Sequence, residues 1–181
     1  MLRSPAALFL VLVSVACRKS EWEQVEPATL GSAGQARLEA ARTAVSDLGG
    51  RLKQDLLAAL EAGGPGAAVM ACQQIAPRIA SEVGEERGLA IGRTSHRLRN
   101  SSNAAPAWAE ATVRACVDEE QVWLGPGDRL GLLRPIPTAP LCLQCHGAPA
   151  DLDPSAQIAL GGSYPDDAAT GFAVGDVRGY F

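Results

Sequence analysis

Aromatic side chains and histidines are scarce in this sequence of 181 residues. Phe, Trp and Tyr together make up 4% of it and histidine occurs twice, whereas 47% of the residues are hydrophobic. This composition is typical of a folded domain with a mainly aliphatic core. No Ser-His-Asp order or metal triad is visible around so few histidines, so the sequence predicts that the protein is not an enzyme.

Other absences narrow the set of partners. Acidic and basic residues are interspersed at a net charge of −4 without a basic stripe, which argues against nucleic acid as a partner. No long apolar run follows residue 17, so we expect no membrane span beyond it. The chain has no internal repeat and is long enough for one domain with its own core.

The N-terminus has the pattern of a secretory signal. Arg3 supplies a positive charge, residues 6–15 form an apolar run, and small residues precede Cys17. We therefore predict a signal peptide over residues 1–17 of the lipoprotein type, with lipidation at Cys17. Such a protein is exported to the periplasm or cell envelope and touches a membrane through its lipid anchor only. The alternative is a cleaved signal that releases a soluble protein.

Helical periodicity dominates the first part of the mature chain. Residues 18–37 are polar and predict a tether, and residues 38–181 form the predicted domain. Apolar residues recur in steps of three and four, which indicates an amphipathic helix over 38–62. The run Gly63-Gly64-Pro65-Gly66 ends this helix.

A second amphipathic helix is predicted over 67–86. Its periodicity puts Cys72 on the buried face and turns Met70 aside. Pro77 lies inside this helix and is expected to bend or interrupt it.

Shorter elements fill the rest of the chain. In order, they are a strand at 88–92, an irregular loop at 93–103, a helix at 106–116, a hairpin within 121–136 that turns at 125–128, a loop after residue 147, and a closing hairpin at 170–181. Helices followed by antiparallel strands predict the α+β class.

Two cysteines and a histidine stand together as Cys142-Leu-Gln-Cys145-His146. This C-x-x-C-H pattern is typical of covalent attachment of a c-type haem. Residues i and i+3 lie on one side of a helical turn, so two thiols can reach the two vinyl groups of one porphyrin, and the histidine then faces the iron. We expect one haem c bound through Cys142 and Cys145, with His146 as an axial ligand.

Three other interpretations of the motif are weaker. A thioredoxin-like redox pair needs a βαβ setting that the flanking residues do not provide. A zinc site needs a second ligand pair, and only His96, Cys72 and Cys116 remain for it. A disulfide across two residues is strained.

A six-coordinate iron needs a second axial ligand. The candidates are Met70, Cys72, His96 and Cys116. The helical face favours Cys72, because Met70 points away from it. His96 lies in a polar stretch, and a cysteine on a short helix such as Cys116 is more often a small buried hydrophobe.

Four stretches together resemble a known family. They are residues 68–80 (AVMACQQIAPRIA), 91–108 (IGRTSHRLRNSSNAAPAW), 134–147 (RPIPTAPLCLQCHG) and 164–181 (YPDDAATGFAVGDVRGYF). The chain is similar over residues 38–181 to a family of exported, single-haem c-type domains long known as a domain of unknown function. The resemblance implies a PAS-like antiparallel sheet flanked by helices, with a long N-terminal helix.

The resemblance also implies roles for individual residues. It implies a cysteine sulfur opposite the motif histidine, and that cysteine aligns with Cys72. Arg93, Asn100 and Asn103 match a polar loop that we expect around the haem edge or its propionates. The alternative for the two asparagines is a structural role, because Asn caps turns readily. Tyr164 matches the beginning of the last of the four stretches, where we expect a structural role.

His/Cys ligation suggests what such a haem would do. A thiolate ligand stabilises the ferric state, so we expect low-potential electron transfer or redox sensing. The partner would be a redox protein or a membrane-bound signalling protein. The alternative is a sensor of NO or CO that signals through a partner protein.

Overall fold

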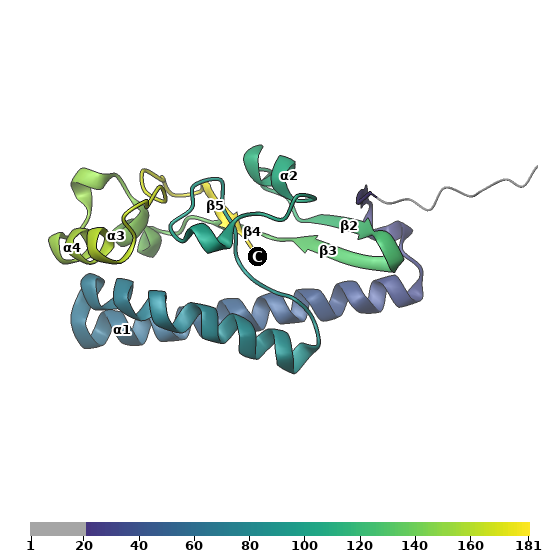
Figure 1. Cartoon of the computed structure of the whole chain (residues 1–181), viewed down its shortest axis with the longest axis horizontal. Helices are drawn as coiled ribbons and strands as arrows, with labels where there is room; N and C mark the ends of the chain where they lie inside the picture. The colour runs from purple at the N-terminus through teal and green to yellow at the C-terminus, as the bar shows by residue number, and fades with distance from the viewer. Residues whose placement is uncertain (1–20) are drawn as a thin grey trace, which may run out of the picture.

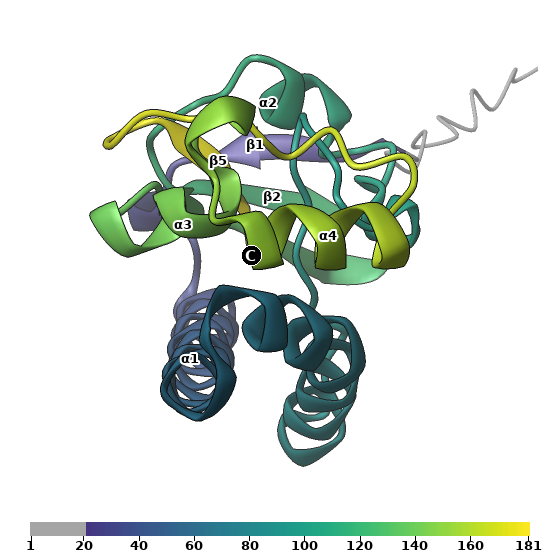
Figure 2. The ribbon, with the colours of Figure 1, turned by 90° about the vertical axis from the view of Figure 1, so that its left-hand side faces the viewer.

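The chain folds into two layers, seen in a computed structural model that describes residues 21–181 (Figure 1). One layer is the long helical element α1 (Ser32–Arg87), and the other holds small antiparallel sheets and short helices (Figure 2). The expected α+β class with a long N-terminal helix is confirmed, while the PAS-like assignment stays a prediction. The expected signal peptide and Cys17 lie outside the described residues.

Element α1 is a helical hairpin. Gly63 and Gly64 leave helical geometry, and Gly64 has φ 72°, a value that favours glycine because it has no Cβ. Two arms therefore run side by side, as Figure 2 shows end-on. The two predicted helices and the break between them are confirmed. A bend or an interruption was expected at Pro77; the interruption is wrong, because the second arm continues through this residue, and the bend stays a prediction.

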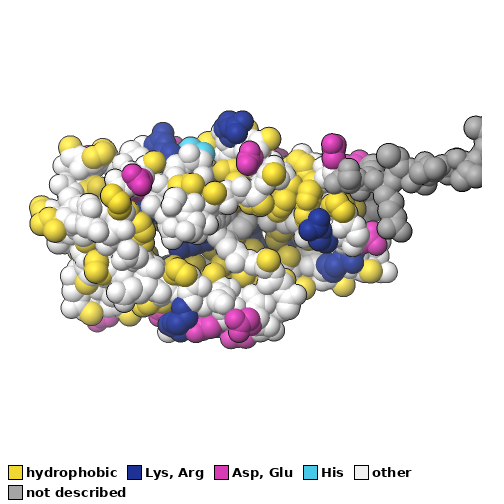
Figure 3. Space-filling model, viewed as in Figure 1, with side chains coloured by type: hydrophobic (Ala, Val, Ile, Leu, Met, Phe, Trp, Pro, Cys, Tyr) yellow, Lys and Arg dark blue, Asp and Glu magenta, His cyan; other side chains and the backbone are white. Residues whose placement is uncertain are grey.

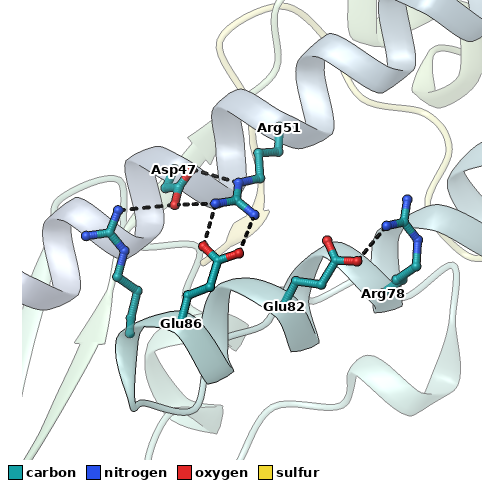
Figure 4. Close-up of polar contacts among 6 residues, drawn as sticks. Asp47, Arg51, Arg78, Glu82 and Glu86 are labelled. Atoms are coloured by element: carbon teal, nitrogen blue, oxygen red, sulfur yellow. Dashed lines mark hydrogen bonds and ion pairs between the residues drawn. The ribbon is translucent and has the colours of Figure 1, made fainter.

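Apolar residues and ion pairs join the two arms. Ala44 and Leu48 of the first arm pack against Ile79 and Val83 of the second, and each is at most 2% exposed. At the rim, Arg51 bridges Asp47 of its own arm (2.9 Å) and Glu86 of the other arm (2.6 Å), as Figure 4 shows.

Two antiparallel sheets form the other layer. In the first, β1 (Glu23–Val25) and β3 (Arg129–Leu133) flank β2 (Gln121–Gly125). The hairpin predicted within 121–136 is therefore confirmed. The second sheet pairs β4 (Pro135–Pro137) with β5 (Val177–Tyr180).

Short helices complete the layer. The α-helices are α2 (Glu110–Arg114), α3 (Leu143–His146) and α4 (Pro154–Ser163), and the 3₁₀ turns are Pro27–Thr29, Ser101–Asn103, Pro126–Asp128, Pro140–Cys142 and Pro149–Asp151. Helix α4 packs on α1 around Val69, Leu152, Ala156 and Leu160. The helix expected over 106–116 is present but shorter.

Four local expectations differ from the structure, and three of them involve a distant partner. Residues 21–37 are not a simple tether, because β1 joins β2 and α1 already begins at Ser32. Residues 88–92 form no strand, and the neighbouring Thr94 makes a single bridge to Tyr180. The closing hairpin at 170–181 is absent because β5 pairs with β4 instead. The loop expected after the motif contains α4, whose first turn is capped by Asp153.

All three tryptophans gather at one place on the first sheet. The rings of Trp22 and Trp108 stack with centroids 4.7 Å apart, and Trp108 lies 6.2 Å from Trp123. Gly125 and Gly131 make room for them, because a Cβ at either position would come within 2.8 Å of an indole ring. The cluster fixes the N-terminal strand to the domain.

Candidate functional site

The C-x-x-C-H motif forms a single helical turn. A 3₁₀ turn that ends at Cys142 leads into α3, which contains Cys145 and His146. Gly147 ends the turn in extended geometry, and its N–H donates to the Leu143 carbonyl at 3.0 Å. Both thiols and the imidazole line one cavity of about 230 Å³.

The His146 ring is held through one nitrogen. Its Nδ1 lies 2.7 Å from the carbonyl oxygen of Ala169. Because a carbonyl only accepts, Nδ1 carries the proton and Nε2 keeps its lone pair. Burial, together with the nearby Arg99 and Arg178 charges, lowers the pKa of His146 to about 2. The imidazole is therefore neutral at physiological pH, the form in which histidine binds a metal.

Cys72 reaches the same cavity from the second arm of α1. It is half-buried, and burial raises the pKa of its thiol. The positive charges of Arg93, Arg99 and Arg178 act in the opposite direction. Cys145 packs against the cluster around Val69, one helical turn before Cys72 on α1, so the two thiols lie on neighbouring parts of the wall.

The three other axial candidates lie elsewhere. Met70 is 44% exposed, and its Sδ accepts a hydrogen bond from the hydroxyl of Ser163 at 3.3 Å. His96 packs edge-on against Phe172, with ring centroids 5.6 Å apart. Cys116 follows α2 with φ 52°. Met70, His96 and Cys116 do not line the cavity that contains the motif.

Arginines dominate the charge of the cavity wall. Four arginines line it and no carboxylate does: Arg93, Arg97, Arg99 and Arg178. Figure 3 shows a hollow between the α1 arms and the layer above.

Two of these guanidinium groups lack a counter-charge. Arg97 lies over the Phe172 ring, and Arg99 pairs with Asp167. No ion pair within residues 21–181 involves Arg93 or Arg178. Burial lowers the pKa of both groups. The charge of Arg178 lowers the pKa of Arg93 further, and the charge of Arg99 lowers that of Arg178. Unpaired cations in a partly enclosed cavity favour an anionic ligand.

Comparison with known proteins then identifies the family. A sequence profile named Tll0287-like matches residues 12–181. The chain belongs to the Tll0287-like family. Among solved structures it is similar to the crystal structure of the cyanobacterial haem protein Tll0287, with 21% identity, a TM-score of 0.53, and coverage of 80% of this chain and 91% of that one. No curated protein matches the chain.

In this Tll0287-like chain one cavity brings together every site residue predicted within the domain. These are Cys72, Arg93, Asn100, Asn103, Cys142, Cys145 and His146. Asn100 also has a structural role, because its side chain accepts from the N–H of Ser102 at 3.0 Å and caps a 3₁₀ turn.

Sequence reasoning missed other residues of the cavity wall. Arg99 and Arg178 line it. Tyr164, which was expected to be structural, lines it as well, and burial raises the pKa of its hydroxyl. One signal could have indicated Arg178: it is the only charged residue of the last strand, directly before Gly179 and the fully buried Tyr180.

Two further observations concern the described part of the chain. None of its helices is both long and apolar enough for a membrane crossing. No three His, Cys, Asp or Glu side chains of residues 21–181 group closely enough to hold a bare metal ion.

Proposed function

We propose that this protein is an exported c-type haem protein that transfers electrons at low potential or senses redox state. The main support is that one cavity contains the two motif thiols, the motif imidazole and Cys72, and omits the rival ligands Met70, His96 and Cys116. The solved relative is itself described as a haem protein.

The residues present fit this cofactor. Cys142 and Cys145 would hold the porphyrin through thioether bonds, and His146 would bind the iron through its free Nε2. Cys72 would supply the second protein ligand to the iron. The cofactor would supply one-electron redox chemistry. The chain's own residues keep the imidazole neutral and oriented, and contribute the thiol from α1.

The unpaired arginines fit the acidic groups of the same cofactor. A haem has two propionates, and Arg93 and Arg178 are cations without a carboxylate partner among the described residues. A guanidinium binds a carboxylate through two parallel hydrogen bonds. The electrostatics of the cavity therefore favour a ligand with negative charge and an apolar body, because aliphatic side chains such as Leu56, Leu60 and Val69 form much of the remaining wall.

The test is expression in a host competent for cytochrome c maturation. We expect the protein to be coloured, heavier than its polypeptide by one haem, and low-spin when oxidised. Colourless protein at its bare polypeptide mass would disprove the proposal.

Replacing the proposed thiolate ligand tests the axial assignment. We expect Cys72→Ala to change the oxidised spectrum and raise the reduction potential, because a thiolate stabilises ferric iron. Met70→Leu and Cys116→Ser are matched controls and should leave both unchanged. If Cys72→Ala has no effect and His96→Gln changes the spectrum, the assignment of Cys72 is wrong.

We further propose that the protein acts in the periplasm or envelope, anchored by lipid at Cys17, with a redox protein or membrane-bound signalling protein as partner and without enzymatic activity. Mass spectrometry of the N-terminal peptide tests the anchor. The alternative role of gas sensing predicts that CO or NO changes the spectrum of the reduced protein, whereas electron transfer does not require it.

A further inference from the structure

A short segment runs along the motif turn and holds it on one side. We call residues 167–172 the strap. The N–H of Phe172 donates to the carbonyl oxygen of His146 at 3.0 Å, and the carbonyl oxygen of Ala169 accepts from Nδ1 of the same histidine at 2.7 Å. The orientation of the His146 ring therefore depends on where the strap places Ala169.

One ion pair fixes the strap. Asp167 is 9% exposed, and its two carboxylate oxygens have different tasks. Oδ1 accepts from the N–H of Ala169 at 2.8 Å, and Oδ2 accepts from Nε of Arg99 at 3.0 Å. The carboxylate thus links the strap to the polar loop that contains Arg99.

Arg99 extends the contact to the motif itself. Its side chain is 16% exposed, and Nη2 donates to the carbonyl oxygens of Cys145 at 2.5 Å and Ala169 at 3.3 Å. Arg99 therefore donates a hydrogen bond to the residue before His146. It also donates to the same carbonyl oxygen that accepts the hydrogen bond from Nδ1 of His146.

We propose that the Arg99–Asp167 pair is a positioning device for the axial imidazole. It acts through Ala169, fixing the ring plane of His146 and keeping its Nδ1–H bond short. A short bond of this kind makes an imidazole a stronger electron donor to a metal. This inference deepens the proposed function and rests on it.

The test compares holoprotein of wild type, Asp167→Asn, Arg99→Gln and the double variant. Covalent haem content should stay within twofold of wild type, because Cys142 and Cys145 are untouched. We expect each single variant to raise the reduction potential and shift the oxidised low-spin spectrum, since a loosened Nδ1–H bond weakens donation to ferric iron. The double variant should show the shift of one single variant, because the pair acts as a unit.

The matched control is the exposed pair between the α1 arms, tested as Arg51→Gln and Glu86→Gln, which should leave potential and spectrum unchanged. Arg99→Lys is the milder variant if the others fold poorly, because it keeps the charge and loses the fork. An intermediate shift for it supports the proposal. Lower thermal stability with potential and spectrum unchanged, in Asp167→Asn or in Arg99→Lys, overturns it. Wild-type protein without covalent haem would instead disprove the proposed function.

Discussion

The two ends of the α1 hairpin differ in how completely their apolar side chains are buried and their arginines are paired. Away from the Gly63–Gly64 turn, Leu48 and Val83 are fully buried and Arg51 and Arg87 are paired with carboxylates. Toward the Gly63–Gly64 turn the same two arms face a cavity where Arg93 and Arg178 have no carboxylate partner among residues 21–181 and Nε of Arg178 is buried without a hydrogen-bond partner.

The difference shows which part of the molecule serves stability and which serves binding. We call the end away from the Gly63–Gly64 turn the closed end. It needs no ligand, because its apolar side chains are packed and its arginines are paired. A cavity wall with half-buried, unpaired cations costs free energy until an anionic ligand binds. Substitutions at the two ends should therefore have opposite effects on the haem-free protein.

The largest effect is expected at the closed end. Leu48→Ala should lower the free energy of unfolding by about 2–5 kcal/mol, because it leaves a cavity between the arms. Urea unfolding followed by circular dichroism measures it. Leu57→Ala is the control, since Leu57 is 45% exposed and should cost less than about 0.5 kcal/mol. Equal losses for both would contradict a packed inter-arm core.

An effect of opposite sign is expected at the cavity. In protein produced without haem, Arg178→Met should raise the free energy of unfolding by about 1 kcal/mol, because an unpaired buried cation is replaced by an apolar chain. Arg42→Met is the matched control and should lower stability, since Arg42 pairs with Glu120 at 2.7 Å. A loss of stability in haem-free Arg178→Met would show that the cavity is already satisfied.

The smallest effect concerns the exposed ion pairs at the rim. Hydrogen bonds from Arg51 lower the pKa of Asp47 and of Glu86 below their usual range. Their contribution is therefore present above the usual carboxyl pKa and is lost as the pH falls through the lowered values. Arg51→Gln should be slightly less stable than wild type at neutral pH and equal to it in acid, with a smaller difference at high salt. A difference that grows on acidification would contradict this sign.

Local patterns predicted the parts of the fold whose partners lie nearby. Helical spacing and the Gly63-Gly64 break were enough for the two α1 arms, and turn residues were enough for the β2–β3 hairpin. The strands β1 and β5 have partners far away in sequence, in β2 and β4, and no local signal reports such pairing. Helix α4 was missed although Asp153 and Pro154 mark its start, because Gly161 and Gly162 lie near its end.

The candidate site divides in the same way. The motif turn followed from i, i+3 spacing, and the inward face of Cys72 followed from helical periodicity. The positioning pair did not, because Arg99 and Asp167 are 68 residues apart and each resembles an ordinary surface charge in the sequence. A single charged residue does not reveal its partner, whereas a periodic pattern reveals its own buried face.

Because the three tryptophans cluster, the tryptophan fluorescence of this protein reports on the first sheet alone. In haem-free protein, since all three indoles lie at the first sheet, fluorescence should follow the release of Trp22 from Trp108, that is, the detachment of the N-terminal strand. Ellipticity near 222 nm follows mainly the long hairpin of α1. Recording both during one unfolding experiment therefore separates detachment of the segment nearest the predicted anchor from melting of the domain itself.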